Sequence, residues 1–276
     1  MNTSLNKSPL GQPSLYPDHY DAALLFRLAR QEQRDAIAIT TTLPFYGLDI
    51  WNAYEISWLN TKGKPIVAMG TFYIPCTSPY LVESKSLKIY LNAFSNSSFV
   101  DQHQVKAIIE GDLSTLCGQA VQVDIDLLND YQALPNIGTL SGKCLDTLDI
   151  ECTHYQPYPD ALKTTQSALI SETVYSNLLK SNCLITSQPD WASVEISYTG
   201  NPIDHAGLLQ YIVSLRNHNE FHEHCVERMF MDILKHCKPT SLSVYARYTR
   251  RGGLDINPYR STDAYVVPAN IRLVRQ

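Results

Sequence analysis

An eight-residue pattern that occurs twice constrains the fold of this chain more than any other feature of its sequence. Residues 51–58 (WNAYEISW) and 191–198 (WASVEISY) share a tryptophan, then Glu-Ile-Ser and an aromatic residue at the same spacing. Asp49 and Asp190 stand just before the two copies. Because polar and apolar positions alternate in each copy, we expect both to be strands. The repeat indicates that the chain consists of two related halves.

The order of the segments after each copy also recurs, as a turn, a second strand, a helix and a closing strand. In the first half we expect the turn at residues 62–65, a second strand that ends at residues 86–88, the helix at residues 98–116 and the closing strand at residues 119–126. In the second half we expect the turn at residues 200–202, a second strand that ends at residues 214–216, the helix at residues 221–237 and the closing strand at residues 241–249. This order predicts an α+β fold in which helices cover one face of antiparallel sheets.

The boundary between the halves is expected within residues 130–165, which are rich in turn formers and show little long periodicity. We therefore predict an N-terminal module over residues 1–140 and a C-terminal module over 141–276. A further helix is expected over residues 164–181 (TTQSALISETVYSNLLKS), just before the second copy of the repeat.

Composition and charge narrow the class of protein. Apolar residues make up 44% of the 276 positions and the net charge is −5, so the chain is expected to fold and to lack the basic surface of a nucleic-acid binder. The sequence has neither the apolar core of a signal peptide nor a run of membrane-spanning length, which predicts no membrane association. Seven cysteines without a CxxC predict reduced thiols and a cytoplasmic location.

Cys183 is the first candidate for chemistry. A cysteine attacks as its thiolate and needs a base nearby, and Asp190 follows it across a turn that contains Pro189. Asp190 could take the thiol proton and later return it. From spacing alone, the competing interpretation of Cys183 as a buried structural residue at a helix end remains open.

Two charged stretches are candidates for ligand binding. Residues 82–88 (VESKSLK) could form a solvated strand edge, or Glu83 could be a buried carboxylate that accepts hydrogen bonds from a planar N–H edge such as that of a guanine-type base. Residues 250–253 (RRGG) could form an exposed loop or bind phosphate through arginine and glycine amides.

Three histidines cluster at residues 218, 222 and 224. Zinc is a weak interpretation, because the glutamate of an HExxH motif would have to follow the first histidine directly. A helix start that carries His222 and Glu223 toward a pocket fits the pattern better. No GxGxxG motif follows a strand, and no P-loop is present.

Four segments, VESKSLKIYLNAF, NCLITSQPDWASVEISYTG, FHEHCVE and RRGGLDINPYR, resemble in this order the NADPH-dependent 7-cyano-7-deazaguanine reductases of queuosine biosynthesis, in their long two-module form. The E-S-K-S-x-K element separates this family from the GTP cyclohydrolase I enzymes of similar fold. The resemblance implies two tandem tunnelling-fold modules and a homodimer. It also implies a small-molecule substrate, no nucleic-acid partner, and reduction of a nitrile to a primary amine with two NADPH.

The resemblance also implies roles for individual residues. Cys183 matches the nucleophile that forms a thioimide with the nitrile, Asp190 matches the general acid/base, and His222 matches a pocket residue that assists proton delivery. The implied substrate contacts are Val82, Glu83, Ser84, His222 and Glu223. The implied NADPH contacts are Ser84, Lys85, Arg251 and Gly252. No metal site is implied.

Two other interpretations remain open. A zinc-dependent cyclohydrolase of the same fold would draw its metal ligands from Cys183, His218, His222 or His224. A non-catalytic purine-binding module would not need the Cys183 thiol.

Overall fold

A computed structural model describes residues 16–40, 42–128 and 137–276 of the chain. These residues form two compact units. Unit 1 contains residues 16–40, 49–128 and 250–255, and unit 2 contains residues 42–48, 137–249 and 256–276.

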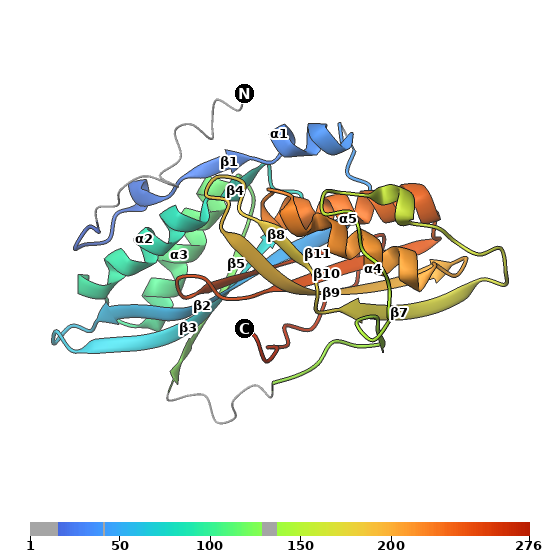
Figure 1. Cartoon of the computed structure of the whole chain (residues 1–276). Helices are drawn as coiled ribbons and strands as arrows, with labels where there is room; N and C mark the ends of the chain where they lie inside the picture. The colour runs from blue at the N-terminus through green and yellow to red at the C-terminus, as the bar shows by residue number, and fades with distance from the viewer. Residues whose placement is uncertain (1–15, 41, 129–136) are drawn as a thin grey trace. The chain divides into compact units, whose positions relative to one another are not determined.

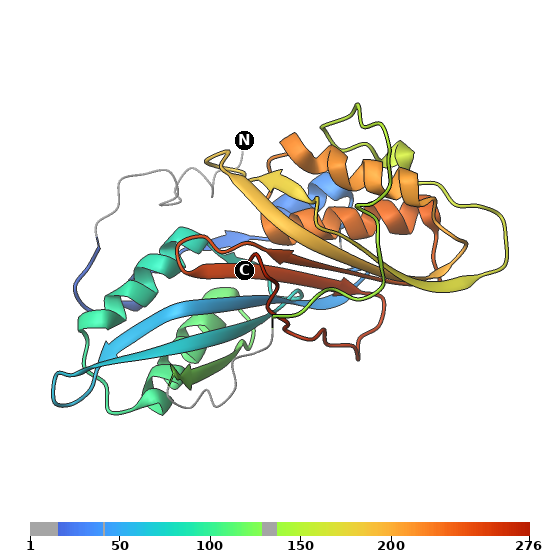
Figure 2. The same ribbon diagram turned by 60° about the horizontal axis from the view of Figure 1, so that its bottom comes forward.

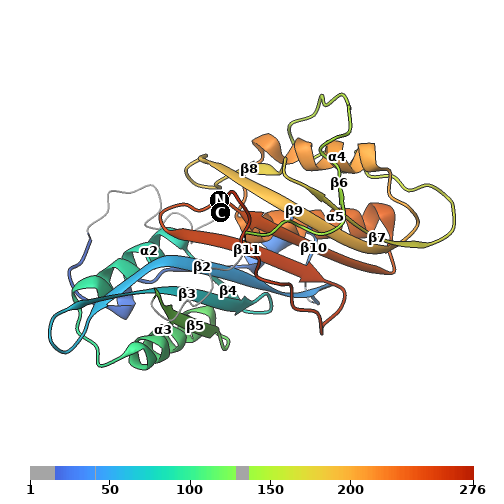
Figure 3. The same ribbon diagram turned by 90° about the horizontal axis from the view of Figure 1, so that it is seen from below.

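Unit 1 is built on a hairpin of β2 (Tyr46–Leu59) and β3 (Pro65–Pro75), to which β5 (Gln122–Leu127) adds in the order β5-β3-β2. Asn60 closes the hairpin turn, since its side-chain oxygen accepts hydrogen bonds from the backbone N–H groups of Lys62 and Lys64. Helices α2 (Ser84–Ala93) and α3 (Gln102–Cys117) lie on one face of this sheet (Figures 1 and 3).

Smaller elements complete unit 1. Strands β1 (Arg27–Ala29) and β4 (Tyr80–Val82) pair antiparallel as a separate two-stranded sheet. The short helices are η2 (Ala22–Leu24), α1 (Gln31–Arg34), η3 (Asp35–Ile37) and η4 (Phe94–Asn96).

Unit 2 has a larger sheet in the order β11-β10-β9-β7-β6. Its strands are β6 (Lys143–Cys144), β7 (Ile170–Ser176), β9 (Pro189–Gly200), β10 (Ser241–Tyr248) and β11 (Leu254–Ser261), and β8 (Lys180–Asn182) pairs with β9 off this path. The pairs are antiparallel except that between β6 and β7. Helices α4 (His205–Ser214) and α5 (His222–Cys237) cover one face (Figures 1 and 2), and η6 (Pro159–Ala161) and η7 (Leu215–Asn217) are single turns.

The apolar spacing of α5 explains why this segment is a helix and which face it buries. Val226, Met229, Phe230 and Ile233 recur three or four residues apart and are fully buried. Strand β9 alternates instead, with Val194, Ile196 and Tyr198 buried. The predicted α+β class, with antiparallel sheets and helices on one face, is confirmed.

The prediction that strands end at residues 86–88 and 214–216 is wrong, because both segments belong to helical regions. Glu83 caps α2 and Asp204 caps α4, each accepting hydrogen bonds from two backbone N–H groups of the first helical turn. In α4 the buried residues Leu208, Tyr211 and Ile212 lie at helical spacing. The β-branched and aromatic residues of these segments hid that spacing in the sequence.

The helix predicted over residues 164–181 is also wrong. Residues 170–176 form β7, which pairs with β9 from Ile170↔Gly200 to Ser176↔Val194, and residues 180–182 form β8. The Thr173 and Ser197 hydroxyls lie 2.8 Å apart across the β7–β9 pair. Packing against a neighbouring strand thus decided the structure of a segment whose β-branched residues also suit a strand.

The two copies of the repeat are strands, as predicted, but they do not occupy equivalent places. Residues 51–58 lie in β2, the first strand of the unit 1 hairpin, and the paired strand β3 follows. Residues 191–198 lie in β9, which pairs with the earlier strand β7 and leads directly into α4. The order of hairpin, two helices and strand does recur in both units, so the recurrence of elements holds although the motif marks different strands.

All seven cysteines have free thiols. No helix in the described part of the chain is both long enough and apolar enough to cross a membrane.

Candidate active site

Cys183 lies in a tight loop of unit 2, directly after β8 and before β9. Its backbone N–H donates to the carbonyl of Gln188 at 2.8 Å, and its carbonyl accepts from the N–H of Ser187 at 3.1 Å. The residue is 9% exposed, so it is buried in the unit. Cys183 follows a strand, so the interpretation as a cysteine at a helix end is wrong.

The loop that carries Cys183 is fastened to the segment that leads into α5. The N–H of Asn182 donates to the carbonyl of His218, and the side-chain amide of Asn182 donates to that of Asn219 at 3.1 Å. Asn219 in turn donates to the Ser187 hydroxyl at 2.9 Å. Ser187 has a left-handed backbone with φ +54°, a conformation that costs energy for a residue other than glycine. These contacts hold the Cys183 loop against the start of the helix that carries His222.

Asp190 and His222 form a buried pair. Asp190 lies in β9 opposite Ser181 of β8, and its Oδ2 is 3.2 Å from His222 Nε2. The carboxylate is 2% exposed and the imidazole 12% exposed. The ring of Tyr248 stacks on the imidazole, with centroids 3.8 Å apart and planes 10° apart. The turn predicted between Cys183 and Asp190 joins the paired strands β8 and β9, and it places Asp190 in contact with His222.

The second nitrogen of His222 has no hydrogen-bond partner among the residues that the structure describes. Nδ1 is buried, and such atoms usually find a partner in folded proteins. A neutral imidazole that donates from Nε2 to Asp190 leaves Nδ1 as an acceptor, and a second proton makes Nδ1 a donor. His222 can therefore pass a proton between Asp190 and a ligand.

Glu223 follows His222 in the first turn of α5 and is 4% exposed. The positive end of the helix dipole favours a carboxylate at this position. The predicted helix start at His222 and Glu223 is confirmed, since α5 begins at His222.

Glu220, two residues before α5, is an ionised group that sequence reasoning missed. Arg228 donates to both of its carboxylate oxygens, at 2.9 and 3.0 Å, and His218 Nε2 lies 3.3 Å from Oε2. Burial opposes ionisation of Glu220, but the hydrogen bonds from His218 and Arg228 outweigh it and lower the pKa. The pair Glu220 and Arg228 fixes the start of α5.

Cys225 provides a contrast to Cys183 within unit 2. Burial raises the pKa of the Cys225 thiol to about 12, so this thiol is protonated at neutral pH and is a poor nucleophile. Burial also raises the pKa of the Tyr248 phenol well above its ordinary value, so the ring stacked on His222 stays uncharged.

In unit 1, Glu83 is the N-cap residue of α2, between Val82 at the end of β4 and Ser84 at the first helical position. Its carboxylate accepts from the backbone N–H groups of Lys85 at 2.7 Å and Ser86 at 2.8 Å. Burial raises the pKa of this carboxyl, and the two hydrogen bonds oppose the shift. At 1% exposure Glu83 is not part of a solvated edge, so that interpretation is wrong. A carboxylate has about four lone pairs, so Glu83 retains capacity for a ligand.

Residues 250–253 form the loop between β10 and β11, as the sequence indicated. The Tyr54 N–H of β2 donates to the Gly253 carbonyl, and the Arg250 guanidinium lies 4.0 Å from the centroid of the Tyr54 ring. Gly252 has φ +60°, and a Cβ there would lie 3.1 Å from Cδ of Lys88. The structure thus brings the loop with Arg251 and Gly252 next to α2, the helix that begins with Ser84 and Lys85.

No group of three or more His, Cys, Asp or Glu side chains in the described ranges is arranged to hold a metal ion. Cys183, His218, His222 and His224 are thus not gathered as a set of zinc ligands.

Besides Glu220, the residues that the sequence did not single out individually are Asn219, Tyr248, Tyr54 and Lys88. Tyr54 and Tyr248 lie in strands, where aromatic residues are common and give no sign of a functional role. Lys88 is one of several charged residues in its segment. Only the pairing of distant segments shows that these residues adjoin the candidate groups.

Comparison with known proteins addresses the family. The model of the family described as nitrile reductase, 7-cyano-7-deazaguanine-reductase N-term, matches residues 16–125, and the QueF-like protein model matches residues 189–265. The two matches fall in different halves of the chain, in agreement with tandem tunnelling-fold modules.

Full-length relatives agree. The NADPH-dependent 7-cyano-7-deazaguanine reductase of Albidiferax ferrireducens is 54% identical over 294 residues, covering 100% of both chains. That of Dechloromonas aromatica is 56% identical over 270 residues, covering 98% of this chain and 95% of the relative. That of Bordetella avium is 52% identical, covering 99% of each. By both comparisons, this chain belongs to the family of NADPH-dependent 7-cyano-7-deazaguanine reductases.

Proposed function

We propose that this chain reduces the nitrile of 7-cyano-7-deazaguanine to the primary amine of 7-aminomethyl-7-deazaguanine, consuming two NADPH, through a thioimide on Cys183. The names of the full-length relatives support the substrate and the reductant. The observation that carries the proposed chemistry is the buried contact of 3.2 Å between Asp190 and His222, beside the hairpin loop that bears Cys183.

In the first step the Cys183 thiol adds across the nitrile. A bond forms from sulfur to the nitrile carbon, one carbon–nitrogen π bond breaks, and the thiol proton moves to the nitrile nitrogen. Asp190 accepts that proton and returns it, with His222 as the hydrogen-bonded partner that holds the carboxylate in place. The resulting C=N bond attached to sulfur is more electrophilic than a nitrile.

NADPH, when bound, supplies a hydride for each of the two two-electron reductions. After the first, the carbon–sulfur bond breaks and the pair of electrons returns to Cys183, which leaves an imine; reduction of the imine gives the amine. Each reduction also needs a proton at nitrogen, which the Asp190 and His222 pair delivers through Nδ1 of His222, the buried atom without a partner among the described residues. Burial of this pair also limits access of water, which would hydrolyse the imine to an aldehyde.

Glu223 and Glu83 are the proposed anchors of the deazaguanine N–H groups. Each is a carboxylate at a helix start with at most 4% of its surface exposed. Buried acceptors of this kind discriminate against analogues that lack the matching donors, because the oxygen lone pairs that face the ligand would then lose those hydrogen bonds. Val82 and Ser84 flank Glu83 in unit 1, and His222 precedes Glu223 in unit 2; each of them is a proposed substrate contact.

The 250–253 loop and the start of α2 fit a phosphate-bearing cofactor. A side chain at Gly252 would be in close contact with Lys88. Because glycine has no side chain, its backbone N–H can approach a phosphate group. Arg251 and Lys85 supply cationic groups, and Ser84 supplies a hydroxyl. We assign Ser84, Lys85, Arg251 and Gly252 to binding of NADPH.

The same proposal extends to the setting of the enzyme. A two-module chain needs a second copy to close the barrel of a tunnelling fold, so we propose a homodimer. The free thiols of all seven cysteines support a reducing compartment, the cytoplasm. The net charge of −5 supports action on the free base and not on nucleic acid.

The test is turnover of 7-cyano-7-deazaguanine with NADPH, following NADPH absorbance and product mass together. We expect two NADPH oxidised per amine formed, no turnover by Cys183→Ala, and normal turnover by Cys144→Ala, a partly exposed cysteine outside the site. Amine formation by Cys183→Ala, or NADPH oxidation without amine, would contradict the proposal.

A further inference from the structure

Gln276 is a buried polar residue in the segment that follows β11, residues 262–276. The residue is only 5% exposed, yet all the hydrogen-bonding capacity of its side-chain amide is used. The side-chain oxygen accepts from Arg247 Nε at 2.9 Å and from the Leu273 N–H at 3.1 Å. The side-chain nitrogen donates to the Tyr248 carbonyl at 2.9 Å and to the Asn257 side chain at 2.8 Å.

Arg275 makes a second set of contacts to the neighbouring strand. Its Nη2 donates to the carbonyl of Ala192 at 2.8 Å and to the hydroxyl of Ser193 at 2.9 Å, both in β9. The same atom donates to the carbonyl of Asn177 at 2.8 Å. Arg275 therefore binds β9 close to Asp190, and Gln276 binds β10 at Tyr248. The two strands are paired at this point, because Tyr248 lies opposite Ala192.

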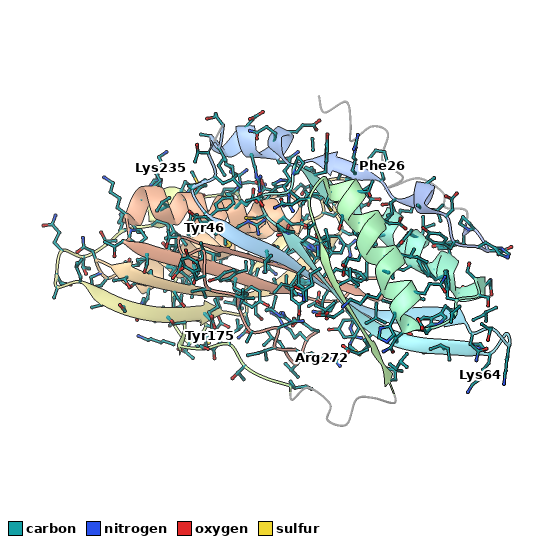
Figure 4. All side chains as sticks on the ribbon, turned by 180° about the vertical axis from the view of Figure 1, so that it is seen from behind. Phe26, Tyr46, Lys64, Tyr175, Lys235 and Arg272 are labelled. Atoms are coloured by element: carbon teal, nitrogen blue, oxygen red, sulfur yellow. The ribbon has the colours of Figure 1, made fainter. Side chains whose placement is uncertain are left out.

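The 262–276 segment lies on the face of the unit 2 sheet opposite to the helices. Figure 4 shows Lys235 of α5 on one side of this sheet and Arg272 on the other, and Figure 1 shows the end of the chain on the side away from α4 and α5. Side chains alternate along a strand, so Arg247 turns toward Gln276 while the ring of Tyr248 turns toward α5 and stacks on His222.

We propose that Gln276 is a positioning residue for the reaction. Its hydrogen bond to the Tyr248 carbonyl, made from the sheet face opposite to α5, fixes the position of the Tyr248 ring on which His222 stacks. The chain of contacts runs from Gln276 to the Tyr248 carbonyl, from the Tyr248 ring to the His222 imidazole at 3.8 Å, and from His222 to Asp190 at 3.2 Å. The catalytic part of this inference rests on the proposed function.

The test compares Gln276→Glu with the wild type in the full-length protein. Glutamate keeps the size of the side chain and its bond from Arg247, but it has no N–H to give to the Tyr248 carbonyl. Gln276→Met, of similar volume and uncharged, serves if the glutamate variant does not fold. Val274→Ala is the matched control, since Val274 lies in the same segment and is 79% exposed.

Two measurements separate the positioning of His222 from its effect on the reaction. The NMR resonances of the His222 ring protons report stacking on Tyr248 and do not depend on any activity; we expect them to shift in the Gln276 variant and not in Val274→Ala. The rate of adduct formation on Cys183 from 7-cyano-7-deazaguanine is expected to fall about five- to thirtyfold, the effect of losing one to two hydrogen bonds of about 1 kcal/mol each. Substrate affinity should stay within about twofold of the wild type.

Unchanged His222 resonances in the folded Gln276 variant would overturn the proposal, even if its melting temperature falls, because the role of Gln276 would then be structural only. A shifted resonance with a wild-type adduct rate would also overturn it. If the wild type forms no adduct, the proposed function fails, and the positioning of His222 by Gln276 is judged on the resonances alone.

Discussion

His222 Nε2 lies 3.2 Å from the Oδ2 atom of Asp190, and the two side chains come from different elements of unit 2, α5 and β9. Each partner limits what the other can do. Asp190 fixes which imidazole nitrogen carries a proton, and His222 keeps the carboxylate oriented at the edge of the Cys183 hairpin. In the proposed reaction, this pair connects a thiol that loses a proton with a nitrogen that gains one.

Asp190→Asn should slow formation of the Cys183 adduct, because an amide cannot accept the thiol proton. The expected loss is about 10²- to 10⁴-fold, the range for removal of a general acid/base. Rapid quenching and mass spectrometry of the protein give the rate. Asp149→Asn, at an exposed carboxylate of the same unit, is the control. Equal adduct rates in Asp190→Asn and wild type would remove Asp190 from the proton transfer.

Asn219→Ala should slow the same step by loosening the loop that holds Cys183. It removes the bonds to Asn182 and Ser187, and each is worth about 1 kcal/mol, or about fivefold in rate if fully expressed.

Ser187→Ala removes only the second of these bonds, so the double variant should be no slower than Asn219→Ala alone. The comparison of both single variants with the double variant measures this coupling. Purely additive effects would show that the Asn219 and Ser187 side chains act independently.

Glu220→Gln should destabilise unit 2 at neutral pH. Removing one partner of a buried ion pair costs about 3–5 kcal/mol, and the 19% exposure of Arg228 reduces this to about 2–3 kcal/mol. Because the folded-state pKa of Glu220 is lowered, its stabilisation is complete above the unfolded pKa of about 4.3 and is lost as pH falls through the folded value.

Denaturant unfolding at pH 7 and near pH 4 checks both statements about Glu220. The difference between wild type and Glu220→Gln should shrink at the lower pH, while the exposed control Glu151→Gln should change nothing. A difference that grows on acidification would mean that Glu220 is not ionised in the folded protein.

Arg251→Ala should raise KM for NADPH about tenfold, the cost of one charge-assisted contact to phosphate. KM for NADH, which lacks the extra phosphate, should stay near its wild-type value. Arg250→Ala is the matched control, because the Arg250 guanidinium stacks on Tyr54. Equal increases for both cofactors would place Arg251 away from the extra phosphate.

Features of the fold and the site can be predicted from the sequence where they depend on residues close together in the chain. Its motifs were enough to single out Cys183, Asp190 and His222, since each stands in a short distinctive segment, and local periodicity predicted α5. The strand β7 was mistaken for a helix because its conformation depends on pairing with β9, eighteen or more residues later. Contacts such as Tyr248 on His222 and Gln276 on Tyr248 join segments far apart in the chain, and no local pattern carries them.

The most direct test of the central claim is the intact mass of the protein after mixing with 7-cyano-7-deazaguanine in the absence of NADPH, followed by peptide mapping. The account predicts an added mass equal to the whole substrate, on the peptide that carries Cys183 and not on that of the protonated Cys225 thiol, and its discharge when NADPH is added. Folded protein with a reduced Cys183 that gains no mass would contradict covalent catalysis by this thiol.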